Sequence, residues 1–121
     1  MSVRTLPDGE LSVMQALWAC TPPVSRTEIA ENLSHNLAPT TLLTVLNRLA
    51  EKGFVSIEKR GRQCFYTPLV AEHDYLAQQS HCFFQKLCGG SPSTFASALC
   101  DSGISAEDLA ELRRLLEEDV L

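Results

Sequence analysis

One face of a predicted helix carries polar side chains that could bind DNA bases. They are Thr40, Thr41, Thr44 and Arg48. At about 100° per residue they share an arc of roughly 120° opposite the leucines of the same segment. Threonine can contact base edges and the thymine methyl in the major groove, and arginine can pair with guanine O6 and N7. A merely solvated face would favour better helix formers such as Lys, Glu and Ala, so the pattern favours DNA readout over that alternative.

A basic cluster follows shortly after this helix. Lys59, Arg60 and Arg62 surround Gly61 in a chain whose formal net charge is -5. The flanking segments, 55–57 and 65–70, have the apolar pattern of strands, so we expect a two-stranded hairpin with a basic tip. Such a tip suits DNA phosphates, whose contacts position a protein and carry little sequence information. The alternative is an ordinary solvated hairpin tip.

The elements before the hairpin predict how these side chains are positioned. A first helix is expected over Asp8–Ala19, because the "TPP" after it cannot continue a helix. Ser25 and Glu28 have the spacing of a capping box at the start of a second helix. Pro39 suits the first turn of the third helix and Gly53 its end. Three helices and a charged hairpin predict a winged helix-turn-helix domain over residues 1–70.

Residues 71–121 predict a helical dimerisation region, which makes the whole chain mainly α with a small β wing. Residues 1–70 carry seven basic and six acidic residues, whereas residues 71–121 carry three basic and nine acidic residues. The helices expected in residues 71–121 have little else to pack against, so we expect them to form a homodimer. The alternative is that the apolar stripe of the last helix completes the core of a monomer. The side chains expected at the interface are Tyr75, Phe83, Phe84, Phe95, Leu112 and Leu116.

The chain resembles the penicillinase and methicillin-resistance repressors, whose relatives include copper-responsive repressors. The resemblance covers nearly the whole chain and rests on "GELSVMQALW", "TEIAENL", "PTTLLTVLNRLAEKGFV", "KRGRQCFYTPLV" and "GISAEDLAELRRLLEE". It implies a dimeric transcriptional repressor that binds a palindromic double-stranded DNA operator through an N-terminal winged helix. By position, the polar face of the third helix would meet the groove and the basic cluster the DNA backbone.

The resemblance also bears on how repression ends. In the antibiotic-resistance relatives a membrane sensor with a zinc-protease domain triggers cleavage of the repressor at an Asn-Phe bond. The corresponding residues here are Ser97 and Ala98, so the cleavage motif is absent. Copper-responsive relatives carry paired CxC motifs near the C-terminus, and this chain has no cysteine after Cys100.

The cysteines raise the alternative of a thiol- or metal-responsive regulator. The chain has five, with no CxxC or CxC pair, whereas closed structural zinc sites usually show close ligand pairs. His81, Cys82 and Cys88 are the candidates for metal or redox sensing, because His81 and Cys88 would share a helical face. We otherwise expect no cofactor and no resident metal.

The remaining sequence patterns narrow the class of protein. The chain has no GxSxG, HExxH, GxGxxG or Walker motif, so we expect no enzyme. It has no run of about 18 apolar residues and no signal-peptide pattern, so we expect a cytoplasmic protein without membrane insertion. A winged helix can also serve as a protein-interaction module, which remains the alternative to DNA binding.

Overall fold

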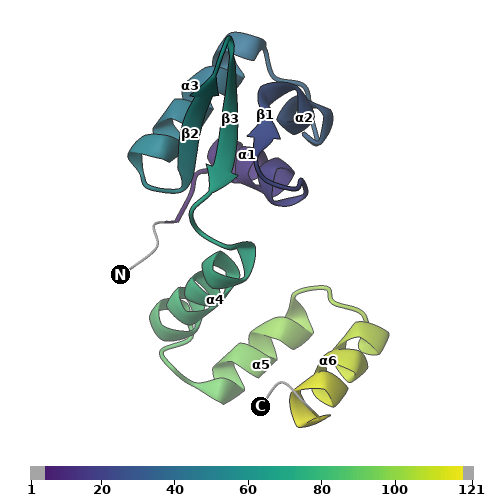
Figure 1. Ribbon diagram of the computed structural model, residues 1–121. Coiled ribbons are helices and arrows are strands. Elements are labelled where there is room, and N and C mark those ends of the chain that lie inside the picture. Colours follow the sequence, from purple (N-terminus) through teal and green to yellow (C-terminus); the bar gives the residue numbers. More distant parts are fainter. Residues whose placement is uncertain (1–4, 119–121) are drawn as a thin grey trace. The chain divides into compact units, whose positions relative to one another are not determined.

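The computed structural model describes residues 5–118 and divides into two compact units, residues 1–79 and 80–121. The elements, labelled in Figure 1 apart from η1, are α1 (Asp8–Trp18), β1 (Val24–Ser25), α2 (Arg26–Glu31), α3 (Pro39–Glu51), β2 (Val55–Arg60), β3 (Gln63–Pro68), α4 (Glu72–Cys82), the π-helical turn η1 (Phe83–Leu87), α5 (Pro92–Asp101) and α6 (Ala106–Glu118). Within residues 5–118, no helix is long and apolar enough to span a membrane.

The first unit is a winged helix, as predicted. Three helices pack with an antiparallel sheet of order β1-β3-β2, and the β2–β3 hairpin forms the wing (Figure 1). The third strand, β1, was not predicted: Val24 pairs with Tyr66 and Ser25 with Phe65. Two residues are too few to show the period-two alternation by which a strand is recognised in sequence.

The helix ends follow the predicted signals. Ser25 and Glu28 form a capping box, in which the Ser25 hydroxyl accepts from the Glu28 backbone N–H at 3.2 Å and the Glu28 carboxylate accepts from the Ser25 backbone N–H at 3.1 Å. Pro39 opens α3, and Gly53 follows its end with a φ of +82°, a conformation that favours glycine. Because these signals fix where α2 and α3 begin, they also fix which residues of each helix face solvent.

The core of the first unit holds α3 in place. Leu42, Leu46 and Leu49 of α3 are buried in one cluster with residues of α1 and of the sheet. An ion pair adds a second attachment, because the Lys52 ammonium at the end of α3 lies 2.5 Å from the nearly buried carboxylate of Glu10 in α1. The opposite face of α3 is therefore held outward at a fixed orientation.

Residues 71–79 pack with the first unit, which therefore extends past residue 70 in the structure. The Tyr75 side chain is buried there: its hydroxyl accepts a hydrogen bond from the Leu6 backbone N–H at 3.0 Å, and its ring contacts Trp18 and Phe54. The Trp18 indole N–H also donates to the Val70 carbonyl at 2.9 Å. Tyr75 thus packs in the core of the first unit, which leaves little of its side chain exposed to a second chain.

The second unit consists of helical segments around a small aromatic cluster. The Phe95 ring of α5 lies 5.6 Å from the Phe83 ring and 5.7 Å from the Phe84 ring of η1, measured between centroids. The Ser105 hydroxyl caps α6 by accepting a hydrogen bond from the Asp108 backbone N–H at 3.1 Å. Cys88 is the only buried residue among residues 80–118. This unit accordingly leaves most of its apolar side chains at least partly exposed.

Candidate nucleic-acid interface

The outward face of α3 carries the predicted base-reading side chains. Thr40, Thr41, Thr44 and Arg48 are all exposed. The Thr44 hydroxyl donates to the Thr40 carbonyl at 2.9 Å within the helix. Its oxygen can still accept a hydrogen bond, and its methyl group adds an apolar contact. The Arg48 guanidinium makes no side-chain hydrogen bond or ion pair within residues 5–118. This face therefore presents the hydroxyl and methyl groups of the threonines together with the Arg48 guanidinium, which is free to bind a partner.

The wing ends in a tight turn that places two cations at its tip. Arg60 pairs with Gln63 across the hairpin, which leaves Gly61 and Arg62 as the two-residue loop. Gly61 has a φ of +63°, and no residue other than glycine has a positive φ within the described chain. A two-residue loop with glycine first and a negative φ second matches a type II′ turn, which fits the twist of a hairpin. Lys59 and Arg62 are both exposed.

Arg60 makes side-chain contacts within the wing, unlike its two basic neighbours. Its Nε donates to the Glu58 carboxylate at 2.8 Å, and its guanidinium lies 5.4 Å from the centroid of the Phe65 ring. The hydrogen bond and the positive charge of Arg60 lower the pKa of Glu58, so this carboxylate stays ionised and partly cancels the charge of Arg60. The structure therefore places all three predicted cations on the wing but leaves Lys59 and Arg62 as its unpaired ones.

Most of the unpaired cations belong to the first unit. Among residues 5–118, those without a side-chain hydrogen bond, ion pair or ring contact are Arg26, Arg48, Lys59, Arg62 and Lys86. Only Lys86 belongs to the second unit. Arg26 was missed by the sequence analysis because it stands alone between a capping serine and a short helix. Its place directly after the cap could have suggested an outward side chain at the start of α2.

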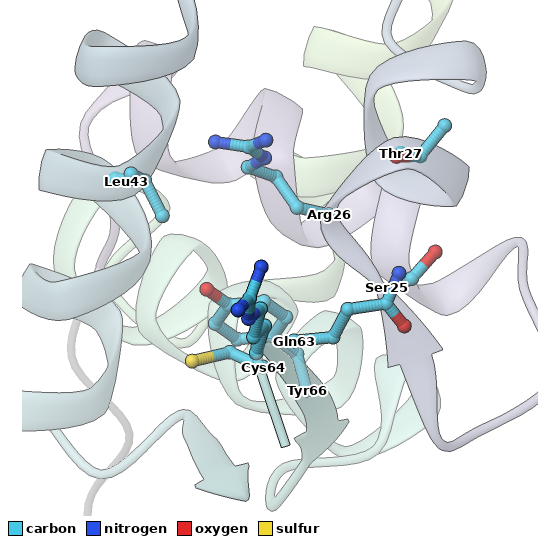
Figure 2. Close-up of a pocket in the computed structure, with 8 residues that line it drawn as sticks. Ser25, Arg26, Thr27, Leu43, Gln63, Cys64 and Tyr66 are labelled. Atoms are coloured by element: carbon cyan, nitrogen blue, oxygen red, sulfur yellow. The ribbon is translucent and has the colours of Figure 1, made fainter. Parts of the chain in front are cut away.

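A cleft of about 260 Å³ lies beside α3, between the start of α2 and strand β3. Its lining includes Arg26 and Thr27 of α2, Leu43 of α3, and Arg62 and Cys64 at the wing. Figure 2 shows the Arg26 side chain reaching across the cleft toward Leu43. The lining contains no aspartate or glutamate.

A buried phenol completes the lining of this cleft. The Tyr66 side chain lies among the lining residues and is almost fully buried. Burial raises the pKa of its hydroxyl, so the phenol stays neutral at neutral pH. The cleft therefore combines two cations with neutral polar groups and offers them no counter-charge of its own.

The predicted interface residues of the second unit differ in exposure. Phe84 and Phe95 are half-buried in the aromatic cluster, whereas Phe83 is 40% exposed. On α6, Leu112 and Leu116 are 36% and 46% exposed. These two leucines and Phe83 therefore remain available to a partner.

The other predicted residues of the second half have clear positions. Ser97 and Ala98 are exposed on α5. His81 and Cys82 end α4, and Cys88 follows η1 with its side chain buried. Within the described residues, no three His, Cys, Asp or Glu side chains are grouped closely enough to hold a metal ion.

Comparison with known proteins places this surface in context. A sequence model described as penicillinase repressor matches residues 6–118. The penicillinase repressor of Bacillus licheniformis is 33% identical over 119 residues, which cover 96% of this chain and 92% of the relative. The methicillin resistance regulatory protein MecI of Staphylococcus aureus is 27% identical over 115 residues, 93% of this chain and 94% of the relative.

A solved structure is also similar. It is the solution structure of the Bacillus licheniformis BlaI monomeric form in complex with the blaP half-operator, with 33% identity and a TM-score of 0.50. The similarity covers 61% of this chain and 92% of that chain.

Proposed function

Because this chain belongs to the penicillinase repressor family and is a winged-helix DNA-binding transcriptional repressor, we propose that it binds a palindromic operator as a homodimer. In this proposal the exposed face of α3 enters the major groove, and the wing cations contact the adjoining phosphates. Two half-sites bound by two tethered protomers would be occupied far more strongly than one.

The positions of the unpaired cations support the DNA-binding surface of this proposal. Four of the five unpaired cations in residues 5–118 lie on α2, α3 and the wing, and Arg48 lies on the same face of α3 as the threonines. Unpaired cations in a chain with a net charge of -5 point to an anionic partner. A similar protein has been solved with its half-operator, which makes DNA the partner we propose.

The homodimer is supported by the second unit. With only Cys88 buried among residues 80–118, this unit has too small a core to account for its folding alone. Leu112, Leu115 and Leu116 of α6 are exposed along one stripe that a second copy could cover. We propose that residues 80–121 associate with the same residues of a second chain.

Derepression is proposed to act through this association. Any event that separates the second units would leave each protomer bound to a single half-site. Its affinity for the operator would then be correspondingly lower. Ser97 and Ala98 are exposed on α5 and correspond to the cleavage position of sensor-protease relatives, although the Asn-Phe motif is absent. Cleavage there would separate α6 from the DNA-binding unit.

Charge reversal at the wing tip tests DNA binding separately from assembly. The double variant Lys59→Glu, Arg62→Glu should lose measurable operator binding, because both unpaired cations of the wing become anions facing phosphate. Its sedimentation coefficient should equal that of the unchanged protein. A matched double variant, Arg113→Glu and Arg114→Glu on α6, should retain DNA binding.

Retention of full DNA affinity by the wing variant would contradict the proposed interface. If the unchanged protein binds no duplex at any salt concentration but captures a protein partner, the protein-interaction alternative takes its place.

A further inference from the structure

The cleft beside α3 holds two arginines that the fold itself does not use. Arg26 and Arg62 come from α2 and from the wing, and neither has a side-chain hydrogen bond or ion pair within residues 5–118. The carboxylate of Glu28, two residues after Arg26 on α2, already accepts hydrogen bonds from the Ser25 backbone N–H and hydroxyl. Two guanidinium groups that line one cleft without a counter-charge repel each other, and an anion between them relieves that repulsion.

The other lining groups indicate which kind of anion fits. The Thr27 hydroxyl and the Gln63 amide add neutral hydrogen-bond donors, and Leu43 supplies an apolar wall. Guanidinium groups match the tetrahedral oxygens of a phosphate, to which they can each donate two hydrogen bonds. A volume of about 260 Å³ accommodates a phosphate group but is small for a drug-sized ligand.

We propose that this cleft is a phosphate seat in which Arg26 and Arg62 hold one phosphate of the operator backbone. The inference rests on the proposed function and deepens it, because it adds Arg26 to the DNA-binding surface and gives Arg62 a definite partner. The seat would fix the position of α3 in the groove from the side of α2, while Lys59 contacts the backbone further along the wing. Inorganic phosphate shares this chemistry and should occupy the same seat more weakly.

The test compares Arg26→Gln with Lys86→Gln, a matched loss of one unpaired cation from the second unit. Both variants and the unchanged full-length protein are titrated against one duplex over a range of salt concentrations. Arg26→Gln should weaken binding on the order of tenfold and reduce the slope of log affinity against log salt by less than the roughly 0.9 per protomer of a fully lost phosphate contact, because Arg62 still neutralises part of the same phosphate. Lys86→Gln should change neither quantity.

Two further measurements separate a phosphate seat from a merely structural role. If Arg26 and Arg62 hold the same phosphate, the double variant Arg26→Gln, Arg62→Gln should lose less affinity than the sum of the single variants. Cys64 lines the cleft, so bound duplex should slow its alkylation by iodoacetamide, whereas exposed Cys100 of the second unit should react as before. Site-resolved mass spectrometry of the alkylated peptides measures both rates.

The outcomes distinguish this inference from the proposed function. If Arg26→Gln equals the unchanged protein in affinity and slope while Lys59→Gln binds more weakly, the seat is overturned and the DNA-binding proposal stands. If the unchanged protein binds no duplex, the backbone assignment and the proposed function both fail. Replacement of chloride by inorganic phosphate at constant ionic strength should weaken DNA binding more for the unchanged protein than for Arg26→Gln. An equal effect on both would contradict occupancy of the cleft.

Discussion

Arg48 lies on the outward face of α3, one turn after Thr44, with its guanidinium uncommitted within the described chain. If it pairs with a guanine, Arg48→Ala should cost about 1–3 kcal/mol at that base pair and little on unrelated DNA. The measurement is the dissociation constant on the selected operator and on a scrambled duplex of equal length. An equal loss on both duplexes would show that Arg48 contacts phosphate and does not read a base.

Glu58 restrains the one wing cation that is paired. Replacement by glutamine removes a negative charge from the wing and weakens the 2.8 Å contact of Arg60 from a charge-assisted to a neutral hydrogen bond. Glu58→Gln should therefore tighten binding to random duplex by roughly two- to fivefold, since an exposed ion pair of this kind is weak. It should also steepen the salt dependence. Fluorescence anisotropy over a salt series measures both effects, and weaker binding would indicate that the ion pair prepares Arg60 for DNA.

The pH dependence of this pair follows from the same contact. The pKa of Glu58 is lowered by Arg60, so the stability that the pair contributes is present above the ordinary carboxyl pKa and is lost as the pH falls through the lowered value. At neutral pH the carboxylate remains charged. The effect of Glu58→Gln on DNA binding should accordingly be constant between about pH 6 and pH 8.

The ion pair between Glu10 of α1 and Lys52 at the end of α3 helps to fix the orientation of α3. The Glu10 side chain is 9% exposed and that of Lys52 is 24% exposed, so removal of one partner leaves a largely desolvated charge. Lys52→Met alone should destabilise the fold by about 2–4 kcal/mol, and the double variant Glu10→Gln, Lys52→Met by less than the sum of the single variants. Urea unfolding of the four proteins measures the coupling, and strict additivity would contradict it.

The elements were predictable from sequence where a local signal determines them. Ser25 with Glu28, Pro39 and Gly53 mark helix ends through their own backbone chemistry, and the apolar period of α3 separates its buried face from its exposed face. Strand β1 was not predictable, because its two residues are extended only through pairing with β3. The domain boundary depends on Tyr75, whose burial comes from contacts with residues far away in the sequence.

The same distinction holds for the candidate site. The polar face of α3 and the basic cluster around Gly61 are visible in the sequence because their members are neighbours along one element. The pairing of Arg60 with Glu58 is a local relation between residues i and i+2 of strand β2. Arg26, in contrast, joins Arg62 in a cleft only through the packing of α2 against β3. Such a relation depends on tertiary structure, which residue spacing alone does not specify.

Assembly is a property of the whole molecule and should depend on the exposed stripe of α6. Leu112→Glu with Leu116→Glu should convert the proposed dimer to monomer, because two buried carboxylates would face the partner's apolar stripe. Ala110→Glu, on the other side of α6, is the matched control and should remain dimeric. Sedimentation velocity measures the state of each variant.

Loss of the dimer should in turn affect DNA binding in a specific way. The Leu112→Glu, Leu116→Glu monomer should bind a half-site duplex as well as the unchanged protein, because the first unit is intact. On the full operator it should bind about 10²–10⁴-fold more weakly, since the tethering of two half-sites is lost. Unchanged affinity for the full operator would show that the second units do not provide the tether.

The most direct test of the account is selection of bound sequences from a random duplex pool with the unchanged protein, at two salt concentrations. A homodimer with one recognition helix per protomer should select two short half-sites related by a two-fold axis, about one or two helical turns apart. The higher salt should weaken binding without changing the motif, because phosphate contacts carry little sequence information. Recovery of no motif, or of a single half-site without symmetry, would contradict recognition of a palindromic operator by a homodimer.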